Sequence, residues 1–340
     1  MNAQPSPELI LQIGTGFWAS KTLLSAVELE LFTVLGNEQL RAAEIRDRCS
    51  LHPRSVVDFL DALVSLGLLD RDGNGDDARY ANTADTALFL DKTQPTYTGG
   101  ILEMANARLY PFWGNLTTAL RTGEPQNEAA GGQDFFGTLY ADEARLEQFL
   151  RAMQGVQMGA FMALVGSVDL SKAKVLCDVG GANGTLCALA VQANPELRAV
   201  LFDLPAVGPV AERNLKTVGV DDRVTVMAGD FFADDLPQAD VITMGNILHD
   251  WDEDEKRMLI GKAYAALSDG GRFIAIENII DNERRSNTFG LLMSLNMLIE
   301  TQGGFDYTPA QFDGWCREAG FSRTEVIPLA GPTSAAIAYK

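Results

Sequence analysis

Two groups of residues in this chain have types and spacing that could support chemistry, and the first is a glycine-rich turn. In VLCDVGGANGTLCALA a predicted strand ends at Asp178-Val179, and Gly180, Gly181 and Gly184 lead directly into a predicted helix. Glycines let such a turn close tightly and let a ligand lie against bare backbone, while the helix N-terminus offers free N–H groups to an anion. The pattern is GGxxG rather than GxGxxG, and alone it does not separate nicotinamide, flavin and adenosyl ligands.

Acids follow at the ends of the next two predicted strands. Asp203 of LFDLP lies about 20 residues beyond the turn, where a carboxylate can accept both hydroxyls of a ribose, and we also expect Leu204 at the ligand. Asp230 and Phe231 of GDFF end the third strand, where an acid and a ring could hold an adenine. A glycine turn and two acids at three consecutive strand ends favour an adenosyl ligand.

The second group centres on His249, in LHDWDEDE just after the fourth predicted strand. Ligand sites of α/β sheets open at this edge. A phenol has a pKa near ~10, so a positioned base such as histidine would help to remove its proton at neutral pH. The alternative is that His249 only caps the helix that begins at Asp250-Trp251. His52 lies beside Pro53 in a predicted turn, and we assign it no role.

The elements that must position these groups begin near Lys174. KVLCDVGG, RAVLFDLP, VTVMAGD, ADVITMGN and RFIAIENII are short apolar runs separated by helical segments. This alternation predicts a mostly parallel sheet covered by helices on both faces. The tail, RTEVIPLAGPTSAAIAYK, is expected to form an antiparallel hairpin that closes one edge.

The segment from Pro7 to about Leu90 is predicted to be helical with short breaks, and one amphipathic helix is expected over Gly16–Leu35. AAEIRDRCSLHPRSVVDFLDALVSLGLL predicts helix, turn and helix, and DRDGNGDDARYANT predicts a hairpin. This order is that of a winged helix. The second helix offers Arg54 alone as a cation, against two aspartates, so we favour a dimerisation module over a DNA reader.

Residues 96–165 are expected to form a helical linker containing the aromatic cluster LYPFW, which is either core packing or a wall of a substrate pocket. We therefore expect three parts: a dimerisation domain over 1–95, this linker, and a ligand-binding α/β domain over 166–340.

Composition restricts the class of partner. The chain has 340 residues and a net charge of −19, so nucleic acid and anionic membranes are not expected as partners. Four cysteines form no CxxC pair, and the N-terminus lacks a secretory signal, so a cytoplasmic protein with free thiols is expected. No metal is expected, because the only other histidine lies in a different predicted domain.

The run DVGGANG…FDLP…GDFF…ADVITMGNILHDWDEDE…GGRFIAIENII resembles the small-molecule O-methyltransferases of the caffeate and acetylserotonin type. The resemblance extends to GGFDYT and to the N-terminal helices. It implies a fold in which an α/β, Rossmann-like class I methyltransferase domain follows an N-terminal, all-helical winged-helix dimerisation domain, with the short hairpin added. It also implies S-adenosyl-L-methionine as the cofactor, a homodimer whose N-terminal domain adds to the partner's active site, and O-methylation of a small molecule.

Roles for individual residues follow from the same resemblance. His249 would be the base, oriented by the carboxylates of Glu277 and Asp306. The expected cofactor contacts are Asp178, Gly180, Gly181, Gly184, Asp203, Leu204, Asp230, Phe231, Trp251 and Met153, the last beside the transferred methyl. The chain departs from the family at Gly245-Asn246, where a lysine and a tryptophan are common, and at Asp306, where the GGxERT motif has a glutamate.

The acceptor is the least determined part of the prediction. Its expected contacts are Arg108, Tyr110, Trp113, Met293, Asn296, Met297 and Glu300. LQIGTGFWASKTLLSAVELELF and ILEMANARLYPFW are also similar to the bacterial methylthiohydroxybutyrate S-methyltransferases of dimethylsulfoniopropionate synthesis. A thioether carries no proton, so alignment and desolvation without a base would then suffice, with Arg108 holding the acid.

Two hypotheses of other classes remain. A winged helix joined to a ligand-sensing domain would make a transcriptional regulator, although the acidic second helix speaks against it. A nicotinamide oxidoreductase would need a GxGxxG turn, which the sequence lacks.

Overall fold

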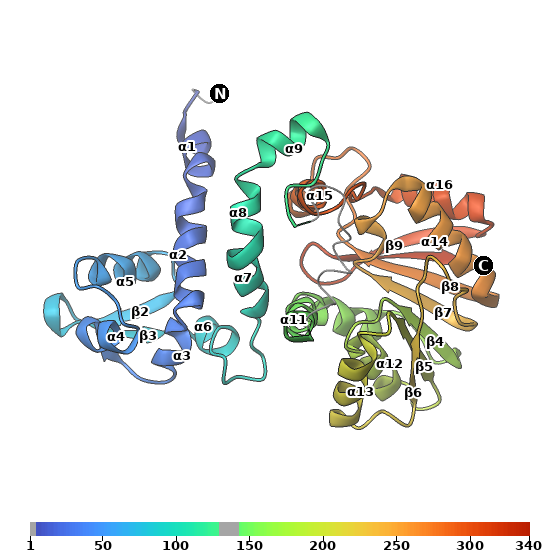
Figure 1. Cartoon of the computed structure of the whole chain (residues 1–340), viewed down its shortest axis with the longest axis horizontal. Coiled ribbons are helices and arrows are strands. Elements are labelled where there is room, and N and C mark those ends of the chain that lie inside the picture. Colours follow the sequence, from blue (N-terminus) through green and yellow to red (C-terminus); the bar gives the residue numbers. More distant parts are fainter. Residues whose placement is uncertain (1–4, 129–142) are drawn as a thin grey trace. The chain divides into compact units, whose positions relative to one another are not determined.

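The computed structural model describes residues 5–128 and 143–340, and the chain divides into two compact units, Met1–Pro111 and Phe112–Lys340 (Figure 1). Each unit has a hydrophobic core of its own. The three-part division at residues 95 and 165 stays a prediction.

The first unit is built mainly of helices. They are α1 (Glu8–Gly14), α2 (Gly16–Glu28), α3 (Leu31–Leu35), α4 (Ala42–Arg48), α5 (Val56–Ser65), α6 (Ala84–Phe89), α7 (Gly100–Met104) and the π-helical turn η2 (Ala105–Leu109). The strands β1 (Leu40–Arg41), β2 (Leu69–Asp72) and β3 (Arg79–Asn82) form a three-stranded antiparallel sheet in the order β1-β3-β2, and the short turn η1 (Gly75–Asp77) joins β2 to β3.

The predicted order of helix, turn, helix and hairpin is present in this unit, with two differences. The helix expected over Gly16–Leu35 is broken at Glu30, whose φ of 54° is left-handed, so that α2 and α3 are separate. The hairpin is joined by a third strand, β1, whose two residues are too short for a periodic pattern. On α5, Asp61 accepts a hydrogen bond from Tyr80 Oη at 2.8 Å and pairs with Arg71 at 2.7 Å, so it braces the hairpin.

The second unit alternates strands with helices as predicted, except that a turn rather than a helix separates β6 from β7. Its strands are β4 (Val175–Val179), β5 (Arg198–Asp203), β6 (Val224–Ala228), β7 (Ala239–Gly245), β8 (Leu267–Glu277), β9 (Arg323–Pro328) and β10 (Ser334–Tyr339). Its helices are α9 (Leu116–Thr122), α11 (Glu143–Ser167), α12 (Thr185–Ala193), α13 (Gly208–Thr217), η3 (Leu248–Asp250), α14 (Glu253–Ala266), α15 (Thr288–Glu300) and α16 (Pro309–Ala319), while the short α8 (Tyr110–Trp113) lies at the boundary of the units.

The seven strands form one sheet in the order β6-β5-β4-β7-β8-β10-β9. The first five run parallel, and β10 pairs antiparallel with both β8 and β9, so the predicted C-terminal hairpin is confirmed. Because β4, β5, β6, β7 and β8 are parallel, the segments that follow their carboxyl ends share one edge of the sheet.

Helices cover both faces of this sheet, and the period-two alternation of the strands divides the core between them (Figure 1). On β4, Leu176 packs with α11, α12 and α13, whereas Cys177 packs with α14 and α16. The two faces of each central strand are therefore apolar, which explains why these strands are continuous hydrophobic runs.

All four cysteines lie in the described ranges and are free thiols, as expected. Among the described residues, no helix has the length and apolar character needed to cross a bilayer.

Helix α14 offers a test of this packing. Leu259 is fully buried in the core, whereas its neighbour Met258 is 40% exposed. We expect Leu259→Ala to lower the free energy of unfolding by about 2–5 kcal/mol, because it leaves a cavity under the sheet. Met258→Ala, the matched control, should change it by roughly 0.5 kcal/mol or less. Chemical unfolding followed by circular dichroism measures both, and equal losses would contradict the packing described.

Candidate active site

Neighbouring side chains pack tightly against the glycine turn that follows β4. Gly180 has a φ of 68°, and a Cβ there would lie 2.4 Å from the Ile247 side chain. Gly184 has a φ of 81° and would meet Leu201 and Leu215 at 3.0–3.1 Å. Both positions therefore require glycine, and the turn leads directly into the N-terminus of α12.

Asp203, at the end of β5, is held beside this turn by two backbone donors. Its Oδ2 accepts from Ala182 N at 2.8 Å, and its Oδ1 accepts from Leu204 N at 2.7 Å. Burial raises the pKa of Asp203 to about 6, and these two hydrogen bonds oppose the rise. The carboxylate is thus oriented at the strand end, with lone pairs left for further donors.

Asp178 occupies a different place from the other predicted ligand contacts. It lies within β4 and is buried, and its Oδ1 accepts from Thr243 Oγ1 of β7 at 2.7 Å. Burial raises the pKa of Asp178 to about 7, a rise that the Thr243 hydrogen bond opposes. The side chain therefore joins two strands beneath the turn. Gly181 is also packed from below, because a Cβ there would lie 2.9 Å from Leu201.

The loop after β6 carries a cluster of aromatic rings. Asp230 accepts from Phe232 N at 2.8 Å, which fixes the turn. Trp251, which follows η3, meets the ring of Phe231 edge-on at 5.8 Å and that of Phe232 at 4.5 Å between centroids. The loops after β6 and β7 therefore meet through their rings. Met153, the predicted neighbour of the methyl group, lies half-buried on α11.

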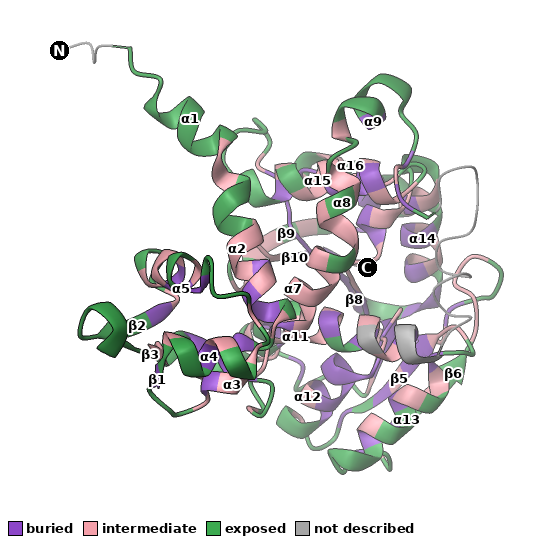
Figure 2. Cartoon of the chain, turned by 60° about the vertical axis from the view of Figure 1, so that its left-hand side comes forward, coloured by how far each residue is buried: buried purple, intermediate pink, exposed green. Residues whose placement is uncertain are grey.

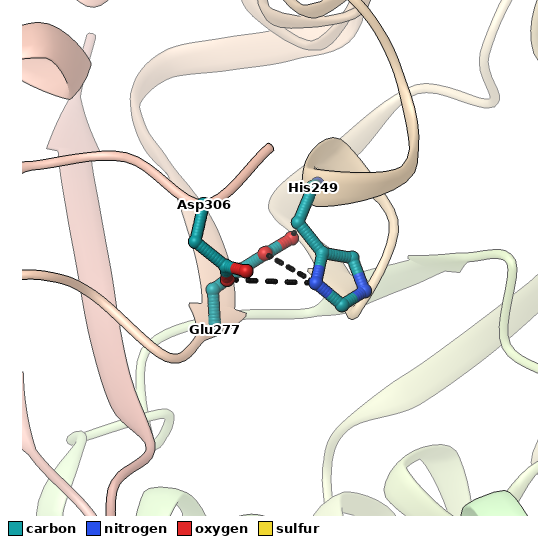
Figure 3. Close-up of side chains that lie close together, drawn as sticks. All are labelled: His249, Glu277 and Asp306. Carbon is teal, nitrogen blue, oxygen red and sulfur yellow. Dashed lines mark hydrogen bonds and ion pairs between the residues drawn. The ribbon is translucent and has the colours of Figure 1, made fainter. Parts of the chain in front are cut away.

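The three predicted catalytic residues come together, as the close-up in Figure 3 shows. His249 Nδ1 lies 3.5 Å from Asp306 Oδ1 and 3.9 Å from Glu277 Oε2, and all three side chains are buried. These are ion-pair distances rather than tight hydrogen bonds, and catalytic contacts commonly shorten when a ligand binds. Glu277 is at the end of β8, and Asp306 lies in the segment before α16.

The other oxygen of Glu277 holds the backbone of η3. Its Oε1 accepts from Ile247 N at 3.2 Å, Leu248 N at 2.9 Å and His249 N at 3.4 Å. One carboxylate thus fixes the short helix and faces the imidazole that the helix carries.

A third carboxylate, which we did not predict as a partner of the histidine, lies on the opposite side of the ring. Asp250 Oδ1 is 3.4 Å from His249 Nε2. Burial would lower the pKa of His249, but the charges of Glu277 and Asp250 and the interactions with Asp306 outweigh it and raise the pKa to about 10. Burial likewise raises the pKa of Glu277 to about 7 and that of Asp250 to about 6, which the histidine opposes.

The predicted acceptor contacts fall into two groups. Met293, Asn296, Met297 and Glu300 lie on α15, and Trp113 Nε1 donates to Asn296 Oδ1 at 2.8 Å. Arg108 and Tyr110 belong to the first unit, where Lys21 lies 5.7 Å from the centre of the Tyr110 ring.

Sequence comparison matches this chain to two families. Residues 113–322 match the O-methyltransferase domain, and residues 11–92 match the O-methyltransferase dimerisation domain. The chain belongs to the O-methyltransferase family.

Relatives of this methyltransferase cover nearly its whole length. It is 42% identical to the tetracenomycin polyketide synthesis 8-O-methyltransferase of Streptomyces glaucescens, over 98% of this chain and 97% of that protein. It is 33% identical to the 3-hydroxy-5-methyl-1-naphthoate 3-O-methyltransferase of Streptomyces sahachiroi, over 96% and 92%. The structure of human N-acetylserotonin methyltransferase in complex with S-adenosylmethionine superposes with a TM-score of 0.91 at 28% identity, covering 100% of this chain and 99% of that one.

The methyltransferase therefore uses S-adenosylmethionine and transfers a methyl group to oxygen of a small molecule. The edge of its sheet fits this cofactor, because the glycine turn leads into the N-terminus of α12 and Asp203, which has lone pairs left for further donors, is oriented beside it. The names of these relatives refer to O-methyl transfer and give no support to S-methylation of a thioether acid.

The absence of a metal stays a prediction for this methyltransferase. One ligand atom from each of His249, Glu277 and Asp306 lies within 4.8 Å of the others, a spacing that metal sites also show. The same atoms form the ion pairs described above, and we assign them no ion.

The turn gives a direct test of cofactor binding. We expect Gly180→Ala to weaken S-adenosylhomocysteine binding at least about tenfold, because the added methyl group collides with Ile247 and strains the left-handed φ. Gly166→Ala on α11, where a Cβ would meet nothing within 4 Å, is the matched control and should bind normally. Titration calorimetry measures both, and normal binding by the Gly180 variant would contradict this role for the turn.

Proposed function

We propose that this methyltransferase acts on a phenolic hydroxyl of a fused aromatic molecule and that His249 is the general base. The observation that carries the proposal is the buried imidazole, with Glu277 and Asp306 at Nδ1 and Asp250 at Nε2. The acceptor class is supported by the two Streptomyces relatives, whose names refer to a polyketide and to a hydroxynaphthoate.

The proposed chemistry is an in-line displacement. When bound, S-adenosylmethionine supplies an electrophilic methyl group, and its transfer to oxygen leaves S-adenosylhomocysteine. The acceptor hydroxyl gives its proton to Nε2 of His249, because two acids, Glu277 and Asp306, face Nδ1, whereas Asp250 alone faces Nε2. The imidazolium that forms is stabilised by the carboxylates around it.

The remaining roles follow from position. Gly180, Asp203 and Asp230 would hold the cofactor at three adjacent strand ends, and Phe231 with Trp251 would cover its adenine. On α15, the Asn296 amide is fixed by Trp113, so its N–H₂ group is oriented for an acceptor oxygen.

The raised pKa of His249 gives this proposal a pH dependence. Below a pKa of about 10 the imidazole is protonated and cannot accept a proton, so kcat should rise with pH from 7 towards 10. We expect His249→Ala to lower kcat by about 10²–10⁴-fold and to abolish this rise. Labelled-methyl transfer to a hydroxynaphthoate, followed across this range, measures both.

The chain has one other histidine, His52, which lies in the first unit and serves as the control. His52→Ala should keep both the wild-type kcat and its rise with pH. Near-normal turnover by the His249 variant would exclude the base role.

We also propose that the methyltransferase is a homodimer joined through α1 and α2. Helix α1 and the first turn of α2 expose apolar side chains, and Figure 2 shows most of α1 as exposed. The apolar side chains that are more than half exposed there are Leu9, Ile10, Leu11, Ile13, Phe17 and Trp18. An apolar surface of this extent marks a binding site for another protein, and the dimerisation domain match overlaps it from residue 11.

Sedimentation velocity tests the dimer. We expect the wild-type chain to sediment as a dimer and the double variant Ile10→Glu with Ile13→Glu as a monomer, because two charges would be buried unpaired in the interface. Met258→Glu, at an exposed apolar residue of the second unit, should leave the dimer intact. A wild-type monomer, or a dimer in the double variant, would contradict the proposal.

A further inference from the structure

Helix α14 begins with a run of charged residues, DEDEKR, yet Lys256 in this run has none of its surface exposed. A lysine is almost never fully buried unless it is paired. Its Nζ donates to the carbonyl oxygen of Trp251 and lies 3.6 Å from the centre of the Phe305 ring. Both neighbours flank active-site residues, because Trp251 follows η3 and Phe305 precedes Asp306.

The charges that act on Lys256 come from every element around it. Glu277 on β8, Asp250 on η3, Asp306 before α16 and Asp252 at the start of α14 stabilise its ammonium form. The ammonium group of Lys256 also interacts electrostatically with Glu253. The buried hydroxyl group of Tyr307 interacts with the same acids, Glu277 and Asp306. The charges of Lys256 and His249 therefore act on the same buried acids, while the Lys256 ammonium contacts the Trp251 carbonyl and the Phe305 ring.

The negative charge of the buried acids requires more compensation than the histidine alone supplies. Glu277, Asp250 and Asp306 are three carboxylates around one imidazole, and buried carboxylates without compensation take up protons. The charge of Lys256 lowers the pKa of both Glu277 and Asp250, opposing their burial. Burial lowers the pKa of Lys256 to about 8, so its ammonium form still prevails at neutral pH.

We propose that Lys256 is a positioning residue for methyl transfer: its ammonium group keeps the carboxylates that orient His249 ionised, and its hydrogen bond to Trp251 fixes the loop that carries the imidazole. The proposal rests on the base role of His249. It assigns a function to a residue that the sequence pattern places on the solvated face of a helix.

The positive charge of Lys256 determines the direction in which its removal shifts the pKa of the carboxyl groups. A carboxylate whose pKa is raised keeps its negative charge only above that pKa and loses it as the pH falls. Without the cation, Glu277 and Asp250 should take up protons at a higher pH. Loss of an opposite charge from a buried cluster shifts the pKa of a carboxyl group by roughly one unit or more.

Four variants separate charge from packing. Lys256→Met removes the ammonium and keeps the length, Lys256→Gln keeps an N–H donor for Trp251 without the charge, and Lys256→Arg keeps the charge. Arg257→Met is the matched control, because Arg257 is the next residue of α14 and pairs with Glu253 and Glu318 at the surface.

One measurement follows this ionisation in the full-length, ligand-free protein. It is the pH inflection near 7 of the His249 ring signals in the NMR spectrum, which respond to the charge of Glu277. With two histidines in the chain, the signals of His52 serve as an internal reference.

We expect the Met and Gln variants to move this inflection upward by about one pH unit or more, whereas the Arg variant and the Arg257 control stay at the wild-type value. A purely structural lysine would change the midpoint of thermal unfolding and leave the inflection in place.

An unchanged inflection in the Met or Gln variant overturns the proposal, and so does an Arg variant that shifts as far as they do. If the Met variant does not fold, the Gln variant decides the comparison. The NMR inflection does not depend on turnover, so it tests Lys256 even if His249→Ala retains activity and the base role fails.

Discussion

The site depends on one buried carboxylate, that of Glu277. One of its oxygens accepts backbone N–H groups of η3, and the other faces the imidazole carried by that helix. The position of His249 relative to the sheet is therefore fixed by an anion at the end of β8. Burying such a group is costly unless donors and cations surround it, so the surrounding residues are constrained to compensate its charge.

The same constraint connects the catalytic loop to the cofactor turn. Ile247 donates its N–H to Glu277, and its side chain closes the space over Gly180. Asp178 and Thr243 join the strands beneath these two loops. A substitution in the glycine turn therefore affects the loop that carries His249 directly, because the Ile247 side chain of that loop packs against Gly180. The proposed sites of the methyl donor and of the proton acceptor therefore lie on neighbouring parts of one edge of the sheet.

Site residues could be predicted from the sequence where a local residue pattern places them at the ends of strands. The glycine turn, the acids at successive strand ends and the histidine after the fourth strand were predicted, because strand periodicity places their ends at one edge of a parallel sheet. The break at Glu30 and the two-residue strand β1 were not predictable, since neither has a periodic signal. Asp250 and Lys256 were missed for another reason. They belong to a run of charges that is typical of a solvated helix start, and only the tertiary fold buries Lys256.

The order of the strands has a consequence for synthesis of the chain. Strand β10 lies between β8 and β9, although it leaves the ribosome after both. During translation the free edge of β8 stays unpaired, and β9 has no partner until residues 334–339 arrive. The growing polypeptide therefore exposes a hydrogen-bonding edge beside the buried Glu277 until residues 334–339 have left the ribosome, a stage at which edge-to-edge association between nascent chains competes with closure of the sheet.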